Sequence, residues 1–289
     1  MICYLCGSKE YDIRPGKCRD NEFLKIFECK KCGLVYLSDF SHIKNDFYEN
    51  NGQVKSNEKV KIVNTATIID TQRRFDQFSL LFTNKKVLDF GCGKGAFLMK
   101  LKHEGLCSEL FSLEVNNEYY ETLNKNFTHY SDIDEIENSS LDYITLFHVL
   151  EHLPDPLSIL NKLYVKLKDG GKIIIEVPSS DDVLLKTYKS KVFSKFTYWS
   201  LHLFLFNTNS LTRLIKKTMF NIVYVKQFQR YSLANHLHWL SQEKPGGHLE
   251  YHFLENDLLN QIYSKKLAEI GQCDTIIAEI QKNENTTYS

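Results

Sequence analysis

The stretch VLDFGCGKGAFLMKL, residues 87–101, constrains the fold more than any other part of the chain. Apolar residues around one acid predict a short buried strand, glycines follow at every second position, and an apolar-rich segment then begins a helix. Gly91, Gly93 and Gly95 have the spacing G-x-G-x-G, which differs from the G-x-G-x-x-G of dinucleotide-binding turns. Asp89 stands just before the turn, where its charge would repel a pyrophosphate and attract a cation such as an amino-acid ammonium.

Segments typical of strands and helices alternate along the rest of the chain. Strands are predicted at 87–90, 109–115, 127–133, 141–147, 170–178, 220–229 and 273–281. Helices are predicted at 65–82, 95–104, 117–126, 155–167, 209–219 and 255–270. This alternation predicts a parallel sheet covered by helices on both faces. The last two strands are joined without a right-handed crossover, so they should pair antiparallel at the sheet edge. The expected fold class is therefore α/β, a Rossmann-like seven-stranded sheet with a reversed terminal strand.

Four of the eight cysteines form two matched units, Cys3-x-x-Cys6-Gly and Cys29-x-x-Cys32-Gly. Each unit places two thiolates on one turn, and four thiolates make the closed tetrahedral site of a structural Zn²⁺. Such a site has no open position for catalysis. Cys18 is an alternative ligand, while the other cysteines are expected to be ordinary core or turn residues.

The composition argues against several classes of partner. The chain has 289 residues with 36 basic and 36 acidic side chains, so no global field attracts nucleic acid or an anionic membrane. No apolar run approaches the roughly 20 residues of a membrane span, and the N-terminus lacks a signal-peptide pattern. We therefore expect a cytoplasmic protein with reduced cysteines that acts on a small molecule. These features imply no particular oligomeric state.

The pattern of segments divides the chain into three parts. Residues 1–40 are the expected zinc-binding segment, and 41–84 are a linker with a helical cap. Residues 85–289 are expected to form the domain that contains the sheet. Its insertions at about 181–209 and 231–270 lie outside the common strands and are expected to hold the substrate.

A second acid, Glu114, ends the strand predicted at 109–115, where it could accept hydrogen bonds from both hydroxyls of a ribose. A ligand with a ribose, an amino-acid end and no phosphate is S-adenosylmethionine. The motifs VLDFGCGKGAF, SLEVNN, SDIDEI and LDYITLFHVLEHLPDP occur in this order and resemble those of class I S-adenosylmethionine-dependent methyltransferases. The resemblance implies that Asp89, Gly91 and Gly93 hold the methionine end, Glu114 the ribose, and Asp132 with Ile133 the adenine, while Phe147 and His148 flank the methyl donor.

The segment HVLEH contains His148, Glu151 and His152 and also matches the H-x-x-E-H pattern of inverted zinc proteases. That site needs two histidines on one continuous helix, but two prolines follow closely and leave room for one turn only. No third ligand is evident in the sequence. His148 is instead the candidate general base of methyl transfer, because imidazole titrates near neutral pH. Glu151 and His202 are further catalytic candidates, and hydrogen bonding that shapes the loop is the alternative role of Glu151 and His152.

Aromatic faces combined with Arg, Asn and His donors suit a polar, anionic sugar nucleotide or glycan. The candidate substrate-binding residues are Tyr198 in the first insertion and Arg230, Tyr231, Asn235, His236 and His248 in the second. The paired cysteine units and the segment RYSLANHLHWLSQEKPGGH resemble bacterial enzymes that modify deoxysugars or capsular and lipopolysaccharide glycans. Sugar C-methyltransferases of this type carry a further large C-terminal domain, so the resemblance favours O-methylation. N- or C-methylation of a related sugar, or of a phosphoramidate-type acceptor, is the alternative.

Two other classes of function compete with this interpretation. An RNA methyltransferase could grip its substrate with the cysteine segment, but residues 1–37 are only mildly basic. A non-catalytic binding module is the second rival, and the intact Asp89 turn together with Glu114 argues against it.

Overall fold

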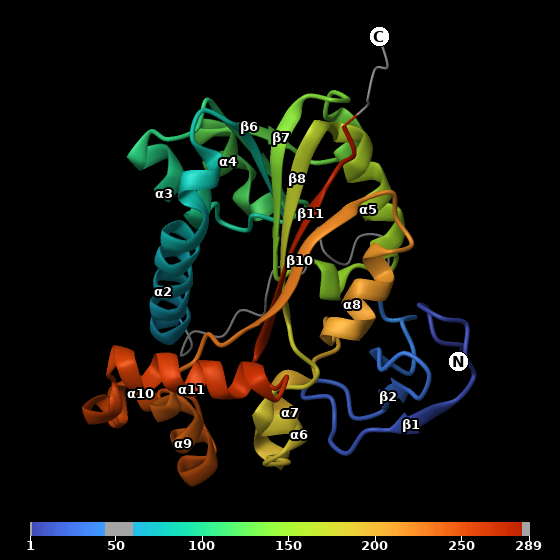
Figure 1. The fold of residues 1–289 in the computed structure, drawn as a ribbon, viewed down its shortest axis with the longest axis vertical. Helices are drawn as coiled ribbons and strands as arrows, with labels where there is room; N and C mark the ends of the chain where they lie inside the picture. Colours follow the sequence, from blue (N-terminus) through green and yellow to red (C-terminus); the bar gives the residue numbers. More distant parts are fainter. Residues whose placement is uncertain (1, 44–59, 285–289) are drawn as a thin grey trace.

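The structure is a computed structural model that describes residues 2–43 and 60–284. Part of the expected linker at 41–84 therefore lies outside the described residues. The described part contains a seven-stranded sheet, a small four-stranded sheet, and helices on both faces and at one end of the larger sheet (Figure 1). None of its helices is both long enough and apolar enough to cross a membrane.

The larger sheet has the strand order β10-β11-β8-β7-β4-β5-β6. Its strands are β4 (Lys86–Phe90), β5 (Glu109–Leu113), β6 (Thr128–Tyr130), β7 (Leu141–Phe147), β8 (Leu167–Pro178), β10 (Asn221–Phe228) and β11 (Thr275–Gln281). Strands β4 to β8 pair in parallel, whereas β11 is antiparallel to both β8 and β10. The α/β fold with a reversed terminal strand is therefore confirmed.

Helices cover both faces of this sheet. In Figure 1, α2 (Val60–Phe78), α3 (Ala96–Glu104) and α4 (Tyr120–Asn126) lie on one side, and α5 (Pro156–Lys166) and α8 (Thr208–Ile215) on the other. Successive side chains of a strand point to opposite faces. Accordingly, Ile173 and Ile175 of β8 pack into the core under α5 and α8, while Ile174 packs with Phe78 and Phe97 on the opposite side.

Local sequence signals account for most helix boundaries. The side chain of Asp155 caps α5, and Pro156 occupies its first turn, as expected. The helix predicted at 65–82 instead begins at Val60 and continues after Phe78 as the 3-10 turn η1 (Ser79–Phe82). Such tighter turns are frequent at helix ends. Further 3-10 turns are η2 (Asn117–Tyr119), η3 (Ile133–Glu135), η4 (Leu150–His152) and η5 (His252–Leu254).

The small sheet joins the cysteine segment to a distant part of the chain. It consists of β1 (Tyr11–Ile13), β2 (Ile26–Cys29), β3 (Val35–Leu37) and β9 (Phe204–Leu205), paired in this order. Strand β9 belongs to the expected insertion at 181–209, so the two segments share one sheet. Arg14 also donates to the backbone oxygen of Ser180 at 2.7 Å. The N-terminal lobe is thereby fixed to the chain that follows β8.

The remaining helices lie beyond the carboxyl ends of the parallel strands. They are α6 (Val183–Lys186), α7 (Lys191–Thr197), α9 (Leu233–Gln242), α10 (Gly247–Glu250) and α11 (Asp257–Glu269). Figure 1 shows them below the sheet, with the blue N-terminal lobe beside them. Open α/β sheets bind ligands at the carboxyl ends of their strands. Both predicted insertions therefore lie at the end of the sheet where a ligand is expected.

Candidate functional site

The glycine turn follows β4 and leads into α3. Gly91, Gly93 and Gly95 all have positive φ, at 70°, 55° and 74°, a region that glycine enters without strain. A Cβ at Gly91 would lie 2.6 Å from Cγ2 of Val149, so the backbone here must approach its neighbour closely. A Cβ at Gly93 would meet nothing within 4 Å. The turn is therefore packed on one side and open at Gly93.

Asp89 lies at the carboxyl end of β4 and is only 4% exposed. The hydroxyl of Thr145 on β7 donates to Oδ1 of Asp89 at 2.7 Å. Burial raises the pKa of Asp89 to about 6, against the opposing effects of this hydrogen bond and of the Arg74 charge. A buried carboxylate with one hydrogen bond is an acceptor that a ligand cation would stabilise further.

Glu114 follows β5, and its carboxylate accepts hydrogen bonds from two separate backbone segments. Its Oε2 accepts from the backbone N–H of Gly93 at 2.8 Å, and its Oε1 accepts from the N–H of Asn116 at 2.9 Å. An ionised carboxylate has about four acceptor positions, so each oxygen retains capacity for a hydroxyl. The two acids and the open space at Gly93 fit a ligand with an ammonium group and a ribose diol.

The other residues predicted to contact the cofactor lie on adjacent strand ends. Asp132 is exposed and caps η3 by accepting from the N–H of Asp134 at 2.8 Å, whereas Ile133 is buried. Phe147 ends β7, and its ring packs edge-on against Phe97 and lies 4.6 Å from the Arg74 guanidinium. These contacts do not test how Asp132, Ile133 and Phe147 would bind a cofactor, so those roles stay predictions.

His148 follows β7 in a strained conformation, with a φ of 57°. Its backbone N–H donates to the backbone oxygen of Glu176 at 2.8 Å, which fixes the residue beside β8. Nδ1 lies 3.2 Å from Oε1 of Glu151, and Nε2 lies 3.2 Å from Oε1 of Glu176. Nη1 of Arg230 also contacts Nε2. The imidazole thus lies between two carboxylates and a guanidinium.

The neighbours of His148 act on its charge in opposite directions. Burial and the Arg230 charge lower its pKa, but hydrogen bonds to Glu151 and Glu176 outweigh them and hold the pKa above its ordinary value. Burial would raise the pKa of Glu151, yet the hydrogen bond from His148 and the nearby imidazoles hold it below its usual range. Glu151 is therefore an ionised acceptor, so Nδ1 of His148 carries a proton.

Helix α2 contributes cations that the sequence analysis did not anticipate. Arg73 donates to both oxygens of Glu176 at 2.9 Å, and Arg74 donates to Oε1 at 2.7 Å. Glu176 is fully buried, and His148, Arg74 and Arg73 hold its pKa well below the ordinary value against the effect of burial. The available signals were the single acid within the apolar run IIIEV and the adjacent arginines on a helix face. We call Asp70, Arg73, Arg74, His148, Glu151, Glu176 and Arg230 the ionic network.

The predicted substrate-binding residues occupy different surroundings. Nη2 of Arg230 donates to the hydroxyl of Tyr231 at 2.7 Å, and Tyr231 is 40% exposed. Asn235 and His236 are buried: the former accepts from the Gly246 N–H and the latter contacts the Tyr263 hydroxyl at 2.8 Å.

Tyr198 and His248, the other two predicted substrate-binding residues, have different surroundings. Tyr198 is buried, and Arg14 of the N-terminal lobe lowers its pKa against the larger, raising effect of burial. His248 is half-buried on α10. Of the predicted acceptor residues, Arg230 and Tyr231 are the pair that the structure brings beside His148.

His202 lies near Glu151 and His152 rather than beside His148. Its Nδ1 is 3.0 Å from the backbone oxygen of Thr197, and its ring centroid is 5.0 Å from that of His152. Burial, with the charge of His152, lowers the pKa of His202 to about 3. The imidazole of His202 is therefore neutral. Only Leu150–His152 of the segment HVLEH form a 3-10 turn, which does not support the two-histidine helix of a zinc protease.

The four predicted zinc ligands converge in the N-terminal lobe. The Sγ atoms of Cys3 and Cys32 are 3.6 Å apart, those of Cys6 and Cys29 are 3.4 Å apart, and all four lie within 4.8 Å of one another. A tetrahedron with Zn–S bonds of about 2.3 Å has edges of roughly 3.8 Å, so the cluster fits this ion. Cys18 instead donates to Asp20 at 3.2 Å and is not part of the cluster.

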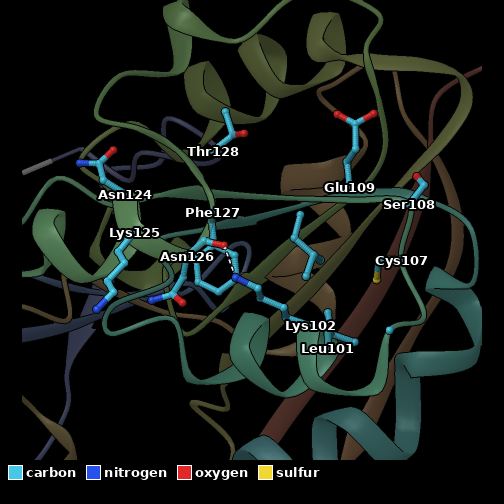
Figure 2. Close-up of a pocket in the computed structure, with 12 residues that line it drawn as sticks. Leu101, Lys102, Cys107, Ser108, Glu109, Asn124, Lys125, Asn126, Phe127 and Thr128 are labelled. Carbon is cyan, nitrogen blue, oxygen red and sulfur yellow. Dashed lines mark hydrogen bonds between the residues drawn. The ribbon is translucent and has the colours of Figure 1, made fainter.

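A hollow of about 500 Å³ lies at the other end of the sheet (Figure 2). It is bordered by Glu109 and Thr128 at the amino ends of β5 and β6, and by Lys102, which donates to the backbone oxygen of Asn126 at 2.8 Å. None of the predicted site residues lines it. The glycine turn, the two acids and His148 all lie at the carboxyl ends instead.

Comparison with known proteins agrees with this arrangement. Residues 70–225 match the family described as a methyltransferase domain. A ubiquinone biosynthesis O-methyltransferase of Coxiella burnetii is 25% identical over 146 residues, which cover 47% of this chain and 58% of that protein. One from Vibrio vulnificus is 33% identical over 100 residues, covering 31% of this chain and 42% of its own length. The chain thus spans less than two thirds of these relatives.

Solved structures share the fold at low sequence identity. A SAM-dependent methyltransferase from Archaeoglobus fulgidus has a TM-score of 0.54 and 18% identity, covering 75% of this chain and 94% of that one. A Haloferax volcanii structure, described as a complex between the Trm112 methyltransferase activator and a methyltransferase, has a TM-score of 0.53 and 12% identity, covering 80% and 100%. With the family match spanning more than half of its length, this chain belongs to the class I S-adenosylmethionine-dependent methyltransferases.

Proposed function

We propose that this methyltransferase transfers the methyl group to a hydroxyl of a sugar nucleotide or of a cell-surface glycan component. The observation that carries the proposal is the position of His148 at the carboxyl end of β7, with Nδ1 held by Glu151 at 3.2 Å. An imidazole whose Nδ1 proton is bound by a carboxylate is oriented to accept a second proton on Nε2.

Methyl transfer from a sulfonium is an in-line displacement. The acceptor oxygen forms a bond to the methyl carbon, the carbon–sulfur bond breaks, and its electron pair stays on sulfur. A hydroxyl must also lose its proton, and in our proposal Nε2 of His148 receives it. Nη1 of Arg230 contacts the same nitrogen, and its charge lowers the pKa of His148, although Glu151 and Glu176 hold the net pKa above its ordinary value. The step therefore requires the unprotonated fraction of His148, which grows as the pH rises.

The cofactor would bind at the same end of the sheet as His148, beside β4 and β5. S-adenosylmethionine supplies an activated methyl group when bound. We propose that Asp89 binds its ammonium, that Glu114 binds its ribose diol, and that Gly91 and Gly93 allow close approach of the methionine end. Asp132, Ile133 and Phe147 complete the proposed cofactor set, as the resemblance implies.

The proposed acceptor class rests on two residues near His148. Arg230 is mostly buried in the ionic network, contacts His148 and donates to the hydroxyl of the exposed Tyr231. We propose that Tyr231, with the charge of Arg230 behind it, contacts a phosphate-bearing sugar. The relatives named as ubiquinone biosynthesis O-methyltransferases support oxygen as the acceptor atom. Tyr198, Asn235, His236 and His248 remain proposed supports of the acceptor, and Glu151 and His202 remain candidates for positioning His148.

We also propose that Cys3, Cys6, Cys29 and Cys32 hold a structural Zn²⁺, and that residues 1–40 form a lobe whose folding depends on it. Four thiolates close the coordination sphere, so this ion would not touch the substrate. Its contribution would be to fix the small sheet that includes β9.

The test is a panel of acceptors incubated with the protein and isotopically labelled S-adenosylmethionine. The panel holds sugar nucleotides, free sugars, phenols, primary amines and RNA, and products are identified by mass spectrometry. We expect the labelled methyl on a hydroxyl of a sugar nucleotide or glycan. Label on an amine or on RNA, or equal labelling of phenols and sugars, would contradict the proposed acceptor. The variant His103→Ala, an exposed histidine of α3, serves as a matched control with unchanged labelling.

A further inference from the structure

A second group of potential metal ligands lies beside the proposed methyl-transfer site. Glu151, His152 and His202 each offer one ligand atom, and these atoms all lie within 4.8 Å of one another. The first two belong to the 3-10 turn after β7, and His202 comes from the insertion at 181–209. Two imidazoles and one carboxylate form a donor set typical of zinc and iron(II) sites.

The imidazoles of His152 and His202 make hydrogen bonds of the kind that metal-binding histidines make. Nδ1 of His152 lies 2.8 Å from the backbone oxygen of Leu201, and Nδ1 of His202 lies 3.0 Å from that of Thr197. A backbone oxygen accepts only, so each Nδ1 carries a proton and Nε2 is the nitrogen left to coordinate a metal. Metal-binding histidines are usually oriented by such a bond from the second ring nitrogen.

Glu151 provides an independent observation. Its side chain is fully buried, and Oε1 faces Nδ1 of His148 at 3.2 Å. The other oxygen, Oε2, is buried without a hydrogen-bond partner among the described residues. A buried carboxylate oxygen without a partner is costly, and a bound cation would remove that cost.

We propose that Glu151, His152 and His202 bind a divalent transition-metal cation of the Zn²⁺ class, at a site separate from the four cysteines. The ion would connect the turn after β7 to the insertion that carries β9. With three protein ligands it keeps an open coordination position for water or an oxygen-bearing ligand. The inference goes beyond the proposed function, because it concerns metal binding and is tested without methyl transfer.

Zinc stoichiometry of the full-length protein tests the site. The protein is equilibrated with Zn²⁺, dialysed against metal-free buffer and measured by elemental analysis. We expect two zinc ions per chain in the unmodified protein and in the control His103→Ala, and one in His202→Ala. One zinc per chain in the unmodified protein, or two in a folded His202→Ala, would overturn the proposal.

A spectroscopic measurement keeps the test independent of how the variant folds. Co²⁺ is added to unmodified protein in which Zn²⁺ occupies only the cysteines. Binding at the proposed site should give visible d–d absorption without the thiolate-to-cobalt charge-transfer band, and His152→Asn should abolish it. A charge-transfer band would show that the cation is held by the cysteines, and no absorption would show that the proposed site does not bind it. Either result would overturn the proposal.

Discussion

The proposed cofactor side and the proposed acceptor side lie at the same end of the sheet and are stabilised in different ways. On the cofactor side, Asp89, Gly93 and Glu114 come from consecutive strand–turn units and are connected by short hydrogen bonds to backbone and hydroxyl groups. On the acceptor side, the ionic network gathers charges from α2, the turn after β7, β8 and the chain after β10. Local backbone geometry stabilises the first side, whereas charge balance over long sequence separations stabilises the second.

This difference predicts how each side responds to change. Removing one group from the cofactor side should weaken one ligand contact and leave the fold intact. Removing one charge from the acceptor side leaves several buried partners unbalanced, which costs more than the contact itself. The acceptor side should therefore be the more fragile of the two.

The largest effect is expected in the lobe that supports the acceptor side. Cys29→Ser should abolish binding of the proposed structural Zn²⁺, and metal binding of this kind contributes about 10–16 kcal/mol to the folding of small zinc domains. Turnover should be lost while S-adenosylmethionine affinity remains, because β4 and β5 pair with strands of the larger sheet and not with those of the small sheet. Elemental analysis and titration calorimetry measure the two quantities. Cys107→Ser, outside the cluster, is the control, and a Cys29→Ser protein that keeps its metal would contradict the assignment.

A single charge within the ionic network should have the next largest effect. Glu176→Gln leaves Arg73 and Arg74 facing a neutral amide, so we expect a loss of about 3–5 kcal/mol in the free energy of unfolding. Denaturant titration measures it. Glu109→Gln removes an exposed partner of Lys86 and should cost at most about 1 kcal/mol. Equal costs for the two variants would show that the network contributes no more than a surface ion pair.

On the cofactor side, Glu114→Ala should weaken S-adenosylmethionine binding without unfolding the protein. Hydrogen bonds to charged groups contribute about 1.5–3 kcal/mol, which corresponds to roughly 10- to 100-fold in the dissociation constant. Titration calorimetry gives the value, and the exposed neighbour Glu118 provides the control Glu118→Ala. An unchanged dissociation constant would place the ribose contact elsewhere.

The smallest effect is a dependence of cofactor affinity on pH. Burial raises the pKa of Asp89 to about 6, so the carboxylate that would bind the ammonium becomes protonated below that pH. Affinity should fall about tenfold between pH 7.5 and pH 5. For the free protein the sign is opposite, because a raised carboxyl pKa favours folding at low pH and this contribution is lost as the pH rises through 6. Asp89→Asn should bind weakly with little pH dependence, and an affinity that is constant over this range in unmodified protein would contradict the role of Asp89.

The sequence predicted local backbone structure better than contacts between distant parts of the chain. The strand at 141–147 and the α5 cap at Asp155 were predicted to the residue, because apolar periodicity and capping are local properties. The cysteine cluster was predicted from spacing alone. The pairing of Glu176 with Arg73 and Arg74 could not be predicted from the sequence, because it depends on how α2 lies across the strand ends. That Glu151 could orient His202 was a hypothesis from the sequence, but the distance between them depends on the path of residues 181–209.

The most direct test of the account compares turnover and S-adenosylmethionine affinity in His148→Ala, with a hydroxyl acceptor identified from the panel. General base catalysis contributes about 10²- to 10⁴-fold, so turnover should fall by that factor while cofactor affinity stays nearly unchanged. A loss of stability and of cofactor affinity together would mean that His148 only supports the structure. Normal turnover with a confirmed hydroxyl acceptor would remove His148 from the mechanism. It would also contradict the proposal that the acceptor side removes the proton.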